Sequence, residues 1–186
     1  MSITTSLSIR LLFHLCGGDV VKLVCLKQHQ IDLLLARGVL ATAIIHPTPI
    51  HTCRGERAKD GRFDESPEGI EWLAFEEQHG LVFWNQHSGE IATDTSRAFA
   101  LGEELIDNPA TTAFDQHLNI YDNPMEWLLN GRRGIVVVKW ELAFDRLRDV
   151  ASVAVAETVL ATYRRHMRPQ HIPKLYVLPK VEGKAA

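Results

Sequence analysis

The chain has 186 residues, of which 46% are hydrophobic and 23% are charged, as is usual for a soluble globular protein with one core. Its 3 cysteines are too few for a disulfide-built scaffold, which favours a reducing, cytoplasmic setting. No run approaches the roughly 20 apolar residues that a membrane span needs, so we expect no membrane partner. We therefore predict a single domain over 1–186.

Charge is distributed unevenly along the chain. Residues 1–131 carry 9 Lys and Arg against 18 Asp and Glu, whereas residues 132–186 carry 11 against 5. Such a bias is typical either of a face for nucleic acid or of two halves that attract each other. The net charge of −3 does not by itself identify a partner.

The first part of the chain is predicted to contain two strands and one helix. Residues 1–8 are rich in Ser and Thr and are expected to be flexible. The apolar, β-branched run at 20–25 favours a strand. Apolar residues at helical spacing favour a helix over 28–37, which Gly38 would end. Residues 39–45 are also expected to form a strand.

The middle of the chain changes rhythm. Residues 53–69 have alternating charges, few apolar side chains and several turn-forming residues, which predict an exposed loop. Short apolar runs separated by turn residues follow, a spacing typical of an antiparallel meander. We expect these strands at 70–75, 81–84, 90–93 and 97–101, with a further short strand at 118–121.

The clearest local signals mark a helix that begins at Asn123. Asn123 can cap the helix, Pro124 suits its first turn, and Glu126 occupies the reciprocal capping position. Gly131 can end the helix, because glycine tolerates the left-handed conformation.

The C-terminal part is predicted to surround one buried strand. The continuous β-branched run at 135–138 is typical of a strand covered on both faces. An apolar stripe predicts a helix over 152–167, a second short strand is expected at 175–178, and residues 180–186 are expected to be flexible. The predicted fold is one α+β domain with a central antiparallel β-meander and a C-terminal helical unit around a buried strand.

Several short segments of the second half form an idiosyncratic pattern: 97–103, 119–121, 134–137 and 164–169, with Pro124, Trp127 and Leu128. This pattern, within about 71–169, resembles uncharacterised bacterial proteins from mobile-element and plasmid neighbourhoods. The resemblance is compatible with a role near DNA. It transfers no activity to this chain and no role to any residue.

A set of five arginines is the leading candidate site. Two of them precede the predicted buried strand, and three lie at the end of the predicted C-terminal helix. The planar guanidinium fork of Arg binds two phosphate oxygens at once, which suits a nucleic-acid-binding face or an acidic protein partner. The alternative is that the helix arginines only complement the carbonyl dipole at a helix C-terminus. The five residues are Arg132, Arg133, Arg164, Arg165 and Arg168.

A small enzyme is the main alternative function. A His beside a carboxylate can act as a general base near neutral pH. Such residues flank the predicted hairpins, although no nucleophile motif accompanies them and the catalytic residues stay unknown. A structural or assembly protein with an exposed apolar patch is a third possibility. The hairpin residues are His79, His87, Glu76, Glu77 and Glu90.

Metal and nucleotide motifs are not found in the sequence. His46, His51 and Cys53 lie close together, but the tight ligand pairs typical of zinc sites are missing. Neither G-x-G-x-x-G nor G-K-[ST] occurs, so we expect no cofactor and no metal. The sequence therefore favours a non-catalytic accessory or interaction protein.

Overall fold

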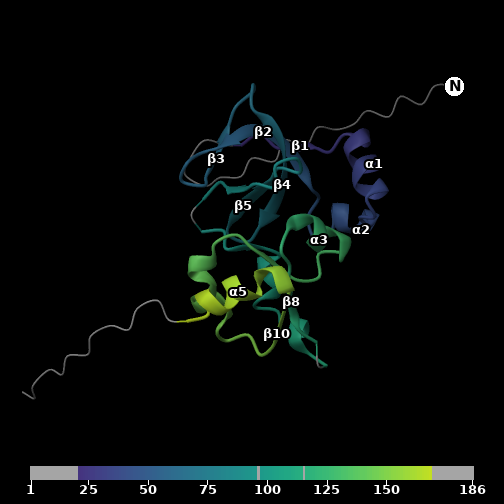
Figure 1. The fold of residues 1–186 in the computed structure, drawn as a ribbon. Coiled ribbons are helices and arrows are strands. Elements are labelled where there is room, and N and C mark those ends of the chain that lie inside the picture. The colour runs from purple at the N-terminus through teal and green to yellow at the C-terminus, as the bar shows by residue number, and fades with distance from the viewer. Residues whose placement is uncertain (1–20, 96, 115, 169–186) are drawn as a thin grey trace, which may run out of the picture.

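The computed structural model describes residues 21–95, 97–114 and 116–168 of the chain (Figure 1). It confirms a mixed α+β domain. An antiparallel sheet occupies the upper part of the view in Figure 1, and a smaller unit of short strands and helices lies below it. The predicted strand at 175–178 and the predicted flexible ends lie outside the described residues. Within these residues, no helix combines the length and apolar character needed to cross a bilayer.

The larger sheet has six strands, whose main path is β1-β2-β4-β5-β6 with β3 paired to β2. Neighbouring strands on this path run antiparallel. Strands β4, β5 and β6 follow one another in both the chain and the sheet, so the predicted meander is confirmed there. The strands are β1 (Val24–Cys25), β2 (His51–Arg57), β3 (Phe63–Glu65), β4 (Ile70–Glu77), β5 (Gly80–Trp84) and β6 (Ile91–Thr93).

Strand β4 lies in the middle of this sheet and contributes to a core on each face. Leu73 and Phe75 face one cluster, and Trp72 and Ala74 face the other, because successive side chains of a strand point to opposite sides. The first cluster, here called the helix-side core, includes Leu34, Ile44, Leu73, Phe75, Trp84, Leu101, Trp127 and Val136. The second, the outer-face core, includes Leu23, Cys53, Phe63, Trp72, Leu81 and Phe83.

Three helices cover the helix-side core: α1 (Gln28–Ala36), α2 (Ala41–Ile45) and α3 (Pro124–Leu129). The predictions of α1 and α3 are confirmed. The Asn123 side chain accepts a hydrogen bond from the Glu126 backbone N–H at 3.0 Å, and Pro124 lies in the first turn. Gly131 follows α3 with a φ of 65°, the left-handed value that the sequence analysis expected.

The strand predicted at 39–45 is wrong, because this segment contains the helix α2. Ala43 and Ile44 are both buried, whereas Ile45 is exposed. Adjacent buried positions do not fit the alternation of a half-covered strand. They fit a single helical turn that lays one side on the helix-side core.

The exposed loop predicted at 53–69 is also wrong, since the segment contains most of β2 and all of β3. Burial alternates along β2: Cys53 and Gly55 are buried, whereas Arg54 and Glu56 are exposed. The charged residues therefore occupy the solvent-accessible side of a strand. Loops can have the same alternation of charged residues, which is why the sequence predicts a loop here.

The smaller unit is built from two strand pairs and short helices. β7 (Ala100–Leu101) pairs antiparallel with β9 (Val136–Val137), and β8 (Leu118–Ile120) pairs parallel with β10 (Val153–Val155). The strand predicted at 97–101 thus shortens to β7 and pairs outside the meander. The helical segments are η1 (Glu103–Leu105), η2 (Pro109–Thr112), η3 (Trp140–Leu142), α4 (Ala143–Leu147) and α5 (Glu157–His166).

The first three residues of the apolar run at 135–138 are buried as predicted and Val138 is half-buried, and the neighbours of the run explain why it is apolar on both sides. Val136 packs in the helix-side core, whereas Ile135 and Val137 belong to a third cluster. This C-terminal core also includes Phe99, Leu118, Ile120, Ala143 and Leu147. The helix predicted over 152–167 begins only at Glu157, because 153–155 form β10 beside β8.

Candidate functional site

Three of the five predicted arginines lie together at the C-terminal end of α5. Arg164, Arg165 and Arg168 are exposed, while Tyr163 and Met167 hold this end of the helix against the C-terminal core. None of the three arginines forms an ion pair with a carboxylate in the described part of the chain. Their guanidinium donors are therefore open to solvent and to a ligand.

The fourth arginine, Arg132, is not on the surface, so the prediction of a face that includes it is wrong. Its exposed fraction is 6%. The guanidinium carbon lies 5.5 Å from the centre of the Phe75 ring and 5.3 Å from that of Trp127. One nitrogen, Nη1, donates to the Thr48 carbonyl at 2.9 Å, and Nε and Nη2 have no hydrogen-bond partner. Burial lowers the pKa of Arg132 to about 10.

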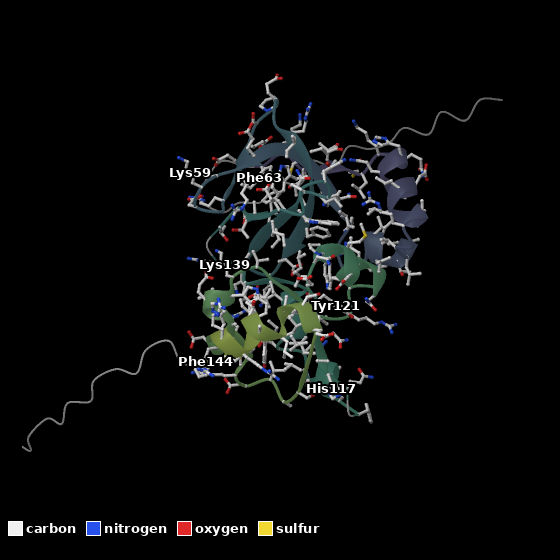
Figure 2. All side chains as sticks on the ribbon, in the orientation of Figure 1. Lys59, Phe63, His117, Tyr121, Lys139 and Phe144 are labelled. Carbon is white, nitrogen blue, oxygen red and sulfur yellow. The ribbon has the colours of Figure 1, made fainter. Side chains whose placement is uncertain are left out.

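The fifth arginine, Arg133, is exposed but lies apart from the end of α5. Its carbonyl accepts a hydrogen bond from the Tyr121 hydroxyl at 3.1 Å. Figure 2 places Tyr121 on one side of the smaller unit and Phe144 of α4 on the other. The C-terminal end of α5 lies on the side of Phe144, as the yellow end of the ribbon in Figure 1 shows. The candidate surface is therefore reduced to Arg164, Arg165 and Arg168.

The half-buried carboxyl group of Glu77 lies at the end of β4. It accepts hydrogen bonds from the backbone N–H groups of Gly102 at 3.0 Å and Glu103 at 3.2 Å. Burial raises the pKa of Glu77 to about 8, although these hydrogen bonds and the charge of Arg132 favour the ionised form. The folded protein therefore binds a proton that the unfolded chain releases near pH 4.5.

We expect Glu77 to make stability fall as the pH rises. Its contribution is fully present below the unfolded pKa of 4.5 and is lost as the pH passes through about 8, because only the folded state holds the proton between these values. The slope is at most about 1.4 kcal/mol per pH unit. Urea unfolding at several pH values within this window measures it. Glu77→Gln should flatten the dependence, and an unchanged slope in that variant would contradict the assignment.

Glu103, which is fully buried, joins three segments of the chain. Its Oε2 accepts a hydrogen bond from the Phe99 backbone N–H at 3.3 Å, and its Oε1 pairs closely with Nη2 of Arg146 on α4. His79 Nδ1, on the β4–β5 turn, lies 3.2 Å from the same Oε1. The carboxylate thus holds together η1, α4 and the segment directly before β7.

This contact unites one of the predicted hairpin histidines with a carboxylate that the sequence analysis did not single out. Both oxygens of Glu103 are already engaged, and His79 Nδ1 is not aligned for a hydrogen bond. The cluster is thus better suited to stabilising the fold than to transferring a proton. Among the other hairpin residues, Glu90 accepts a hydrogen bond from the Ser88 hydroxyl at 3.0 Å, and His87 lines a pocket.

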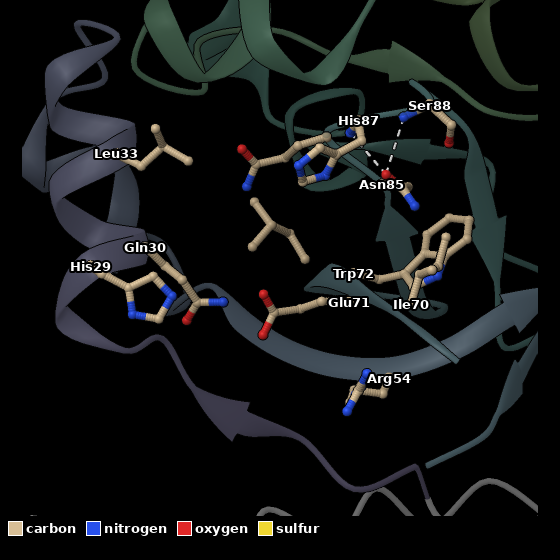
Figure 3. Close-up of a pocket in the computed structure, with 12 residues that line it drawn as sticks. His29, Gln30, Leu33, Arg54, Ile70, Glu71, Trp72, Asn85, His87 and Ser88 are labelled. Carbon is tan, nitrogen blue, oxygen red and sulfur yellow. Dashed lines mark hydrogen bonds between the residues drawn. The ribbon is translucent and has the colours of Figure 1, made fainter. Parts of the chain in front are cut away.

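That pocket has a volume of about 570 Å³ and lies between α1 and the helix side of the sheet (Figure 3). Small-molecule sites typically have volumes of about 300 to 1,000 Å³. Leu33 of α1, which is exposed, and Leu73 of β4 supply its apolar lining. On its floor Arg54 and Glu71 are directly opposite each other on β2 and β4.

Of the residues around this pocket, the sequence analysis singled out only His87. The others come from α1, β2, β4 and the turn after β5, which are far apart in the chain. The Arg54–Glu71 pairing depends on the register of two strands, one of which was predicted as a loop. No local signal in the sequence could have identified this set.

No group of three or more His, Cys, Asp or Glu side chains in residues 21–95, 97–114 and 116–168 is arranged to hold a metal ion. Comparison with protein-family models, with curated proteins and with solved structures finds no match to the chain. The geometry of the described residues is therefore the basis for a functional assignment.

Proposed function

We propose that the protein is a non-catalytic interaction module that contacts the phosphate groups of nucleic acid through the C-terminal end of α5. The observation that carries this proposal is the group of three exposed arginines, Arg164, Arg165 and Arg168, without carboxylate partners in the described chain. Arg donates to phosphate oxygens in a planar, bidentate geometry.

The surroundings of α5 add support for this surface. The rings of Trp140 and His166 lie 6.2 Å apart between η3 and α5. Lys139, directly before η3, places a further cation near this part of the surface, with Nζ donating to the Thr95 carbonyl at 3.3 Å. None of the described helices resembles one that reads base edges, so binding would depend on phosphate contacts and show little sequence preference.

The arginines of α5 also have an alternative role, which is to stabilise the helix itself. Arg164 and Arg165 lie in the last turn of α5, where a cation complements the carbonyl dipole. This role does not use up the guanidinium donors, which can serve a phosphate at the same time. An experiment must therefore measure binding rather than helix stability alone.

We expect labelled duplex DNA and single-stranded RNA to bind weakly at low salt and to dissociate as salt rises. On duplex DNA, log K should fall by about 0.9 for each phosphate contact per tenfold increase in salt, since each contact releases condensed counterion. The Arg164→Ala/Arg165→Ala/Arg168→Ala variant should bind more weakly and with a smaller salt slope. Fluorescence anisotropy at several salt concentrations measures both quantities.

The matched control is Lys22→Ala/Lys27→Ala/Lys59→Ala, which removes the same charge from exposed positions elsewhere. This control should retain both the affinity and most of the salt slope. Equal losses in the two triple variants would indicate general charge attraction and overturn the α5 assignment. Polyglutamate that competes as well as nucleic acid would point to an acidic protein partner instead.

A further inference from the structure

Two buried amide side chains point their donors into the pocket beside α1. Gln30 and Asn85 are 7% and 2% exposed. The Gln30 Oε1 accepts a hydrogen bond from the Lys27 backbone N–H at 2.6 Å. The Asn85 Oδ1 accepts from the backbone N–H groups of His87 at 2.8 Å and Ser88 at 3.1 Å. These bonds hold the oxygen of each amide, and they leave its NH₂ group without a hydrogen-bond partner in the described residues.

The two NH₂ groups are available to a ligand. Neither nitrogen has a hydrogen-bond partner in the described chain, and neither is sealed from solvent. Figure 3 shows the Gln30 nitrogen directed across the pocket towards the Glu71 carboxylate. Water can satisfy these two donors in the free protein, and a ligand in the pocket can replace that water with an acceptor atom.

The carboxylate of Glu71, which faces Gln30, accepts no side-chain or backbone hydrogen bond within the described residues. Glu71 forms no ion pair with a cation in the described residues. Arg54, its cross-strand neighbour, instead donates Nε to the Gly69 carbonyl at 3.0 Å. A ligand would therefore place a donor at Glu71 and an acceptor at Gln30. The opposite charges of Arg54 and Glu71 give the floor no net charge, which suits a neutral molecule.

We propose that this pocket binds an amino-substituted nitrogen heterocycle of the adenine or cytosine type. Such a ring carries an exocyclic amine that can donate to the Glu71 carboxylate. The adjacent ring nitrogen can accept from the Gln30 NH₂ group. Pairing of a carboxylate with the amine of cytosine, and of an amide with adenine, is established chemistry for reading bases. Leu33 of α1 and Leu73 of β4 supply the apolar surface for the faces of the ring.

This site does not depend on the arginines of α5. A free nucleoside has no phosphate, so its binding is insensitive to salt and to the α5 substitutions. Failure of nucleoside binding would leave the phosphate-binding proposal intact, and the reverse also holds.

The test is a titration of the ¹⁵N-labelled protein with cytidine, adenosine and uridine. Side-chain NH₂ signals are followed by NMR, and affinities are measured by calorimetry. Cytidine or adenosine should shift the Gln30 and Asn85 signals. Uridine, which lacks the amine, should bind at least about tenfold more weakly, since one good base contact is worth about 1 to 3 kcal/mol.

Glu71→Gln should weaken cytidine or adenosine binding by about tenfold and remove the preference over uridine. Glu68→Gln is the matched control, because it neutralises an exposed carboxylate that does not line the pocket. Unchanged thermal unfolding would show that both variants are folded. No shift of the two amide signals at millimolar nucleoside would overturn the proposal, as would binding that Glu71→Gln leaves unchanged. A preference for free amino acids over nucleosides would also overturn it.

Discussion

Val136→Asp is expected to abolish cooperative folding or to lower the free energy of unfolding by several kcal/mol. Val136 is 1% exposed and lies in β9, opposite Leu101 of β7, in the helix-side core. A carboxylate at this position would be ionised at a large desolvation cost or be protonated without a hydrogen-bond partner. Natural domains have a total stability of only about 5 to 15 kcal/mol, so the loss would be comparable with the whole.

Urea unfolding followed by circular dichroism measures this effect, and Val136→Ala is the control. The alanine variant creates a small cavity without a buried charge and should stay folded, with a loss of about 1 to 3 kcal/mol. Equal losses of unfolding free energy in the two variants would mean that Val136→Asp destabilises the protein through lost packing and not through a buried charge. A Val136→Asp protein that melts at the wild-type temperature would show that the strand is not in the core.

Glu103→Ala is expected to have the second largest effect, a loss of about 3 kcal/mol. Removing one partner of a buried ion pair typically costs about 3 to 5 kcal/mol. We expect a loss at the lower end of this range because the Arg146 side chain is 33% exposed, so that water can replace part of the interaction. The substitution also leaves the Phe99 N–H without its acceptor.

Two further variants separate the charge from the hydrogen bond. Glu103→Gln keeps an acceptor for the Phe99 N–H and should lose less stability than Glu103→Ala. The double variant Glu103→Ala/Arg146→Ala should be more stable than the sum of the single losses predicts, because the two side chains are in contact. Strict additivity in this cycle would contradict a direct interaction between them.

Local signals predicted the parts of the fold that depend on local chemistry. The helix α3 begins where Asn123 and Pro124 place it, because a cap acts within one helical turn. Helix α1 and the hairpin strands β4, β5 and β6 also follow their own patterns. Likewise, the burial of 135–137 agrees with a run that is apolar on both sides.

Predictions failed where the outcome depended on distant partners. Residues 53–69 have the composition of a loop, yet β2 pairs with both β3 and β4, and this pairing makes strands of them. Residues 39–45 form a helix because the sheet offers an apolar surface to Ala43 and Ile44. Tertiary packing overrides weak local preferences of this kind.

The candidate sites divide in the same way. The sequence alone determined that Arg164, Arg165 and Arg168 would gather, because they lie within one turn or so at the end of a helix. Only the tertiary structure decided that Arg132 is enclosed by Phe75 and Trp127, since those rings come from other elements. It also decided the pocket, where Gln30 and Glu71 face each other because α1 packs on the sheet next to β4. Contacts between elements depend on packing and strand register, which no local pattern specifies.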